Sequence, residues 1–242
     1  MSRERAAKRL RDAIARSNAL HSTYSSDTRE EKKYAEFIAL QLSYFMPFYE
    51  DLRDRPGYSS AIDFVVSDLT GTGIASRDRE LEKVAGLMTR FLPGGALDAL
   101  AFAMTLNARI LEINLGIAAA LIDTSAAGTP ITEKRYCIAS RRVASMDDFD
   151  QLIGMTRQAG ETLAGIVRLP MIKSLLRTMR VPARLAGVVD LHQFLERGYD
   201  TFTGLDDVQE FLDTMQSRMT EVFWRVFKTP LSQLDDIDPM SA

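Results

Sequence analysis

The chain has 242 residues, 46% of them hydrophobic, so it is long enough to bury a sizeable core. Its 30 lysine and arginine residues against 33 aspartate and glutamate residues give a formal net charge of −3, which excludes a global field that would draw the molecule to nucleic acid or to an anionic membrane. Any electrostatic partner must therefore bind a local patch. Cys137 is the only cysteine, which excludes an intramolecular disulfide and is typical of a reducing compartment.

Apolar residues recur at helical spacing along most of the chain, whereas alternating strand patterns are almost missing. We therefore predict an all-α, single-domain multi-helix bundle. Residues 1–56 are expected to form helices that pack on or extend from the core, 57–228 a helical core domain and 229–242 a flexible acidic tail. The basic N-terminal region lacks a following apolar segment, so no secretory signal is expected and we predict a cytoplasmic protein.

In chain order, a basic amphipathic helix is predicted over 3–20 and a second helix from about 27 to the break at Pro47. A third is predicted over 58–69, released by the 71–73 turn. Ser76 is a candidate N-cap for the next helix.

The long apolar stretch over about 96–122 predicts a buried helix at the centre of the bundle. Five polar residues interrupt it, which argues against a membrane span. After a small-residue loop, Pro130 suits the first turn of the next helix, and Ser145 caps a further one. Pro170 and Pro182 are expected to divide the following region into helices over 171–180 and about 183–199, before a last helix over about 206–227.

Several stretches carry a family resemblance. The segment Phe64-Val65-Val66-Ser67-Asp68-Leu69-Thr70 keeps Phe64, Leu69 and an acid at Asp68 and departs at the other positions, and Ser76-Arg77-Asp78, Met179-Arg180-Val181-Pro182-Ala183 and Phe194-Leu195-Glu196-Arg197-Gly198-Tyr199 follow in the expected order. Over about 58–227 the chain resembles a family of uncharacterised, mostly proteobacterial proteins named after a Phe-Phe-Leu-Glu-Glu-Leu-Tyr (FFLEELY) motif. The resemblance implies a helical fold and no known activity.

Motifs of common chemistries are missing from the sequence. The 71–73 turn follows a helix and lacks phosphate-loop context, and no Gly-x-Ser-x-Gly element is present. With two histidines and no Glu-x-x-His pair, we predict no metal site and no cofactor. Cys137 has apolar neighbours and no nearby histidine, which favours a buried inert thiol over a nucleophile.

His192 falls on an apolar stripe with Leu185, Val188, Leu195 and Tyr199. One interpretation is a core histidine bonded to a carbonyl or to Glu196 one turn on, and the other is a general base or haem ligand that lines a pocket.

The polar residues of the central stretch leave the same choice. Arg109 and Glu112 are spaced to pair on one face of a helix, and Asn107 and Asn114 lie close by. These four side chains form either a buried structural network or the lining of a cavity.

The most distinctive pattern is a basic stretch with no acid. Ile172, Leu175, Leu176 and Met179 lie opposite its charges, so a short helix is expected to bury one side and present cations on the other. Such a surface could hold a phosphorylated ligand, anionic lipid or an acidic protein. Alternatively it is a solvated face paired with acids such as Asp206, Asp207 and Glu210. The cations are Arg168, Lys173, Arg177, Arg180 and Arg184.

We therefore expect a non-enzymatic helical binding or interaction protein that uses the basic helix of 168–184, with His192 as a further candidate ligand residue. The alternative is a small-molecule binder or enzyme whose cavity is lined by the central helix and His192. Nucleic acid is disfavoured because aromatic residues do not interleave with the cations. Trp224 and Phe227 lie off the main stripe of the last helix, which fits either a partner surface or cover by another helix.

Overall fold

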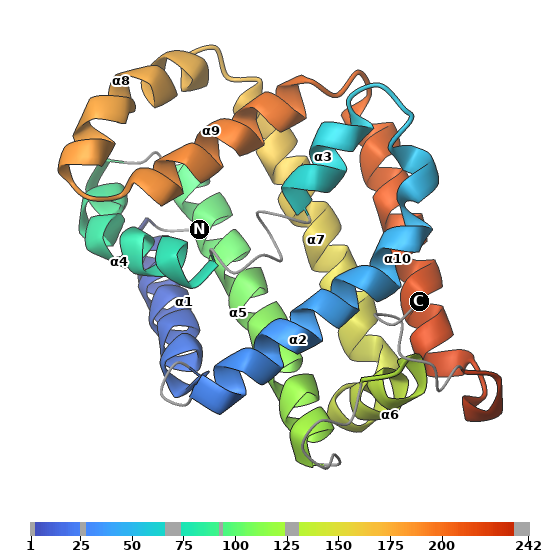
Figure 1. Cartoon of the computed structure of the whole chain (residues 1–242). Coiled ribbons are helices and arrows are strands. Elements are labelled where there is room, and N and C mark those ends of the chain that lie inside the picture. Colours follow the sequence, from blue (N-terminus) through green and yellow to red (C-terminus); the bar gives the residue numbers. More distant parts are fainter. Residues whose placement is uncertain (1–2, 25–27, 66–73, 92–93, 124–130, 235–242) are drawn as a thin grey trace.

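The computed structural model describes residues 3–24, 28–65, 74–91, 94–123 and 131–234, where the backbone is almost entirely helical and forms no strand. This confirms the predicted all-α class, and Figure 1 shows the helices gathered into a bundle. The α-helices of this part of the chain are α1 (Arg3–Tyr24), α2 (Thr28–Phe45), α3 (Tyr58–Phe64), α4 (Ile74–Phe91), α5 (Gly94–Asp123), α6 (Glu133–Val143), α7 (Met146–Val167), α8 (Ile172–Leu185), α9 (Val189–Thr203) and α10 (Val208–Lys228).

Helix α5 is the central element that the apolar stretch predicts. Helices α1, α2, α6 and α7 all contact it. Leu97, Ala101 and Ile117, spread along its length, are completely buried. The bundle is therefore built around α5, and α1, the first helix of the chain, packs along it.

The apolar character of α5 also meets a membrane criterion. Among the described helices, the stretch Gly94–Ile122 is long and apolar enough to cross a bilayer by length and composition. Of its qualifying window, 44% is buried inside the protein. Because the core helix of a soluble protein passes the same test, this property is a weak indication of a span.

Three clusters of buried apolar side chains hold the helices together. One lies where α2, α5, α6, α7 and α10 meet and includes Phe37, Tyr136 and Phe223. A second joins α1, α4 and α5 through residues such as Leu10, and a third joins α3, α7 and α10 through residues such as Phe211. Full burial of a side chain of this size contributes about 1.5–3 kcal/mol, so these clusters supply most of the driving force for folding.

The helix starts follow local capping chemistry, with one correction. Ser145 Oγ accepts the Asp148 N–H at 3.2 Å, and Asp148 Oδ2 accepts the Ser145 N–H at 2.9 Å, which confirms the predicted cap of α7. The N-cap role predicted for Ser76 is wrong because α4 already begins at Ile74, and the Ser76 hydroxyl instead donates to Asp190 Oδ2 at 3.1 Å. Helix α6 begins after Thr132, its N-cap.

The division of the region 171–199 at Pro182 is also wrong. Helix α8 runs through Pro182, and the break falls at Gly187, whose φ of +65° places it in the left-handed region. There the Val188 N–H donates to the Ala183 carbonyl at 2.9 Å and the Gly187 N–H to the Arg184 carbonyl at 3.2 Å. These paired bonds form a Schellman motif, which ends the helix by satisfying its last carbonyls.

Some sequence expectations fall outside the described residues. They are the end of the helix predicted to reach residue 69, the 71–73 turn, most of the 123–129 loop, Pro130 and the last part of the tail, 235–242. Of the tail, the described part forms a short 3-10 turn at Leu231–Gln233, after which Leu234 is buried.

Candidate functional site

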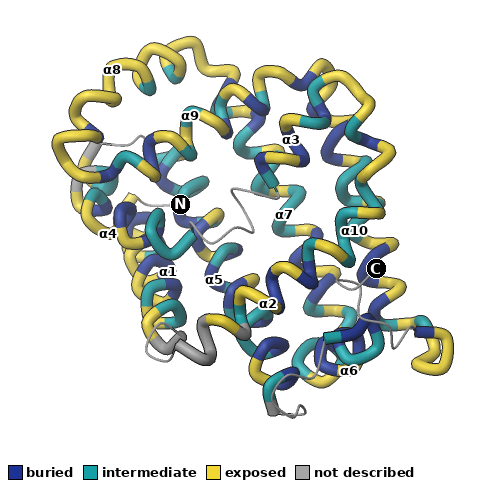
Figure 2. The backbone as a smooth tube through the Cα atoms, viewed as in Figure 1, coloured by how far each residue is buried: buried dark blue, intermediate teal, exposed yellow. Residues whose placement is uncertain are grey.

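The basic stretch forms α8, a helix at the edge of the bundle. It packs against α9 and, more lightly, against α7. Figure 1 shows it at the upper left, on the outside of α9, and Figure 2 shows that most of its length is exposed. Its inner side is narrow, since only Ala183 is buried and Ile172 and Leu176 are half-buried.

The cations of this helix point to solvent on one sector. At 3.6 residues per turn, Lys173, Arg177, Arg180 and Arg184 fall within about 60° of one another around the helix axis. All four are exposed, as is Arg168, which caps the end of α7 just before α8. The chain contains no aspartate or glutamate between Glu161 and Asp190. The structure therefore places four of the five predicted cations on one surface and the fifth at its entrance.

Among the described residues, most of these charges lack a counter-ion. Arg180 Nε donates to Glu196 Oε1 on α9 at 2.7 Å. In the part of the chain that the structure describes, Lys173, Arg177 and Arg184 form no ion pair. Two of the three acids expected to neutralise them are engaged elsewhere: Asp207 caps α10, and Glu210 pairs with Arg55 at 3.1 Å. Asp206 is exposed and forms no ion pair with these cations in the described part of the chain.

A second feature of α8 departs from the prediction. The residues opposite the cations were expected to be buried, but two of them, Leu175 and Met179, are 49% and 43% exposed. The flanking Met171 and Leu185 are 69% and 85% exposed. The reason is that α8 contacts the bundle along one edge only, so its apolar side is wider than its contact with α9. The helix therefore presents both cations and uncovered apolar side chains.

His192 anchors α8 from behind and does not face the cations. It lies on α9, is 8% exposed, and places Nε2 2.8 Å from the Leu176 carbonyl oxygen of α8. Its Nδ1 lies 3.6 Å from Glu196 Oε2, the carboxylate that also holds Arg180. This arrangement matches the interpretation of His192 as a core histidine bonded to a carbonyl, with Glu196 nearby. Leu185 and Leu195, expected on the same buried stripe, are exposed instead.

The stretches that carry the family resemblance meet around α9. The Phe194 ring stacks on Phe64 of α3, with ring centroids 5.4 Å apart, and the Arg77 guanidinium of α4 lies 4.2 Å from its centroid. Two residues on, Glu196 holds Arg180 of α8. Helix α9 thus links three other helices through side chains of those stretches.

The polar residues of α5 bond to neighbouring helices. Asn107 Nδ2 donates to Asp78 Oδ2 of α4 at 3.1 Å, and the buried Ser17 hydroxyl of α1 donates to the same carboxylate. Arg109 and Glu112 pair as predicted at 3.6 Å. Each also has a partner on another helix, since Arg109 reaches Asp148 at 2.7 Å and Glu112 reaches Arg16 at 2.6 Å. Asn114 accepts a hydrogen bond from Gln41 at 3.2 Å. These contacts are those of a structural network that ties α1, α2, α4 and α7 to α5.

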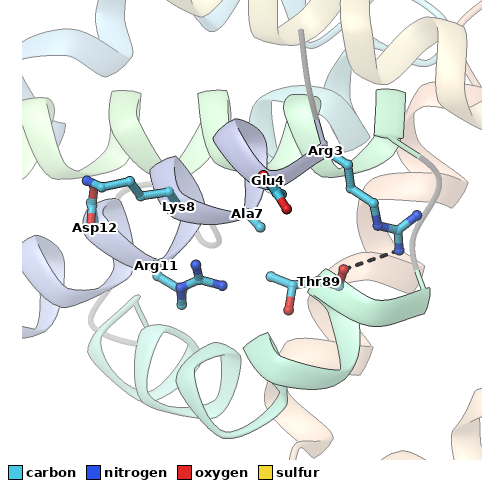
Figure 3. A pocket seen from close by; sticks show the side chains of 7 residues that line it. All are labelled: Arg3, Glu4, Ala7, Lys8, Arg11, Asp12 and Thr89. Carbon is cyan, nitrogen blue, oxygen red and sulfur yellow. Dashed lines mark hydrogen bonds and ion pairs between the residues drawn. The ribbon is translucent and has the colours of Figure 1, made fainter.

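A surface depression of about 760 Å³, which sequence reasoning missed, lies between the start of α1 and the end of α4 (Figure 3). Its charged lining is mixed: Arg3, Lys8 and Arg11 stand beside Glu4 and Asp12. Lys8 already pairs with Asp12 at 2.5 Å, and Arg3 donates to the Thr89 carbonyl at 3.2 Å. Neither His192 nor any residue of the central helix α5 lines this depression.

The described residues offer neither an accessible cysteine nucleophile nor a group of metal ligands. Cys137 is fully buried, and this burial raises the pKa of its thiol to about 11, so the thiolate is scarce at neutral pH. In the described ranges, no group of three or more His, Cys, Asp or Glu side chains is placed to hold a metal ion.

Comparison with known families gives a match over residues 21–232 to a family described as a Domain of unknown function (DUF8198). The chain belongs to this family. No curated protein and no solved structure matches it significantly. Within the DUF8198 region lie α2 to α10, including α8, whereas the α1 residues that line the depression precede it.

Proposed function

We propose that this protein is a non-enzymatic binding protein that uses α8, with Arg168 at its entrance, to engage an anionic partner. The observation that carries the proposal is the set of exposed cations on one sector of α8, in a stretch without any acid. Three of them have no ion pair in the described part of the chain.

The energetics favour a multivalent anion. A single exposed ion pair contributes at most about 1 kcal/mol, so one isolated charge on the partner would be held weakly. Several cations on one surface add their contributions, at about 1 kcal/mol for each Lys or Arg near an anionic surface. Arginine also donates two parallel hydrogen bonds to phosphate or carboxylate groups. The partner is therefore expected to carry several negative charges within the length of α8.

The cavity-based alternative has weaker support. His192 is engaged by the Leu176 carbonyl and Glu196, and Asn107 and Glu112 bond to residues of neighbouring helices. Each of these side chains therefore has a structural partner that a ligand would have to replace.

The finer family assignment and the location are also proposals. We place the chain in the FFLEELY-motif group, since the stretches that carry the resemblance contact one another through Phe64, Arg77, Phe194 and Glu196. The single cysteine, a buried thiol, suits the reducing cytoplasm.

The proposal is tested with heparin, a soluble polyanion, and a double charge reversal, Lys173→Glu with Arg177→Glu. Because two cations become anions, affinity for heparin should fall at least about tenfold at low salt. Arg5→Glu with Arg11→Glu on the exposed side of α1 changes the net charge equally and is the matched control. Equal losses in the two variants would show that net charge alone acts and would overturn the role of α8.

A further inference from the structure

Several apolar side chains of α8 are exposed in a line along the helix. Binding of a soluble anion to the cations would leave these side chains uncovered. Met171, Leu175 and Met179 are each four residues apart, so they follow one side of the helix. All three are exposed, and Val181 and Leu185 extend the exposed apolar surface toward the outside. Cations border this surface along one edge. The helix therefore offers hydrophobic contact and positive charge together over its whole length.

The position of α8 suits a broad, flat partner. The helix is about 21 Å long, at 1.5 Å per residue, and lies on the outside of α9 at the edge of the bundle (Figures 1 and 2). Around the helix axis, Val181 and Leu185 lie between the cations and the line of Met171, Leu175 and Met179. A planar partner against this outward side can therefore touch apolar side chains while the long cationic side chains reach it from one flank.

The composition of α8 favours a lipid surface over a protein surface. Protein interfaces are typically rich in aromatic residues and directed hydrogen bonds as well as in Arg and Met. The arginine and methionine residues of α8 therefore suit both kinds of partner, and the remaining residue types distinguish them. Residues 168–187 contain no aromatic residue, no asparagine and no glutamine. The hydroxyl of Thr178 already donates to the Ser174 carbonyl at 2.9 Å. The outer side of α8 thus has few side-chain hydrogen-bonding groups that would lose their partners on entering the headgroup region of a bilayer.

We propose that α8 docks this protein on an anionic lipid bilayer, with its cations at the level of the headgroup phosphates and its exposed apolar side chains, Leu175 among them, dipping among the first acyl carbons. The proposal rests on the proposed function and names its partner. A basic amphipathic helix binds such a surface through apolar burial and electrostatic attraction together. The long stems of Lys173 and Arg177 let their charged ends reach the phosphates while the apolar side chains sink deeper.

The first test is co-sedimentation of the full chain with phosphatidylcholine vesicles, with and without phosphatidylserine. We expect binding only with phosphatidylserine, weakened by salt. Two variants separate the contributions: Lys173→Gln with Arg177→Gln removes charge, and Leu175→Ser with Met179→Ser removes apolar contact. Each should weaken binding at least about tenfold. Ile138→Ser, at a comparably exposed apolar site on α6, is the control and should bind as the natural chain does.

The second test reads the depth of α8 directly. Because Cys137 is fully buried, a cysteine introduced by Leu175→Cys is the accessible thiol to which an environment-sensitive fluorophore can be attached. Its emission should shift to the blue on vesicles that contain phosphatidylserine. The same label at Ser217→Cys, an exposed site on α10, should not shift. Equal shifts at the two sites, or none at Leu175→Cys, overturn insertion of α8.

The outcomes distinguish this inference from the proposed function. If vesicles do not bind but heparin binding still depends on Lys173 and Arg177, the lipid inference is overturned, the proposed function stands and an acidic soluble partner takes its place. If neither vesicles nor heparin depend on these cations, both proposals fail. If vesicle binding survives Leu175→Ser with Met179→Ser unchanged, docking is electrostatic only and the insertion of apolar side chains is overturned.

Discussion

Glu80 on α4 caps α9 from outside that helix. Its Oε2 accepts the backbone N–H of Leu191, in the first turn of α9, at 2.7 Å in a buried setting. The residue at the N-cap position of α9, Val188, has no side-chain acceptor of its own. A carboxylate at this end is also favoured by the helix dipole. The contact therefore replaces a missing local cap and fixes α9 against α4.

Removing this cap should destabilise the protein. Glu80→Ala leaves a buried N–H without an acceptor, so we expect the free energy of unfolding to fall by about 1–3 kcal/mol, measured by urea denaturation. Arg79→Ala, at the neighbouring exposed position, is the control and should change the free energy by at most about 0.5 kcal/mol. A Glu80→Ala chain as stable as the control would contradict the capping role.

His192 should be needed to hold α8 in place. His192→Leu removes the 2.8 Å contact with the Leu176 carbonyl and leaves Glu196 with only one of its two partners. We expect faster hydrogen exchange of the α8 amides and a loss of about 1–2 kcal/mol in the free energy of unfolding. The neighbouring exposed Gln193→Leu is the control. Unchanged exchange in α8 would show that His192 has no anchoring role.

The acid sensitivity of stability should depend on Asp148. Hydrogen bonds from Ser145, followed by the nearby Arg109 guanidinium, hold the pKa of this carboxyl below its ordinary value. A lowered pKa in the folded state means that the contribution is present above the ordinary carboxyl pKa and is lost as pH falls through the lowered value. Asp148→Asn should therefore be less stable than the natural chain near neutral pH, and the difference should vanish in acid.

Urea denaturation at a series of pH values checks this expectation. Asp147→Asn, an exposed first-turn acid beside it, serves as the control. A stability difference for Asp148→Asn that grows as the pH falls would have the opposite sign and would contradict the assignment.

Cys137 should be unreactive in the folded protein. Its thiol is fully buried and burial raises its pKa to about 11, so both access and thiolate content are low. A disulfide-exchange reagent at about pH 8 should leave it unmodified in the native chain and modify it fully in denaturant. Thiol titration measures the rate of modification. Rapid modification of the native chain would show that the site opens.

The features predicted correctly are those that local chemistry determines. The α5 helix follows from apolar residues on nearly every side, and the Ser145 cap follows from a hydroxyl three residues before an acid. The error at Pro182 arose because proline usually ends a helix, whereas Gly187 supplies a better termination five residues later.

The site was only partly predictable because periodicity does not show what covers a helix. The spacing placed Leu175 and Met179 on an apolar side, but their exposure depends on how far α9 extends over α8. The bond from Leu191 to Glu80 joins residues far apart in the sequence, and no local pattern signals it. The cations of α8 were found from sequence because a stretch free of acids needs no tertiary information.

The contacts of α9 have a consequence for how this family varies. Phe194 is held between Phe64 and Arg77, and Glu196 holds Arg180, so three distant stretches share α9 as their common neighbour. A mutation in any one of them alters the fit of the others through α9. Related chains should therefore accumulate substitutions at positions 64, 77 and 194 as a correlated group, and an acid lost at 196 should be matched by a change at 180.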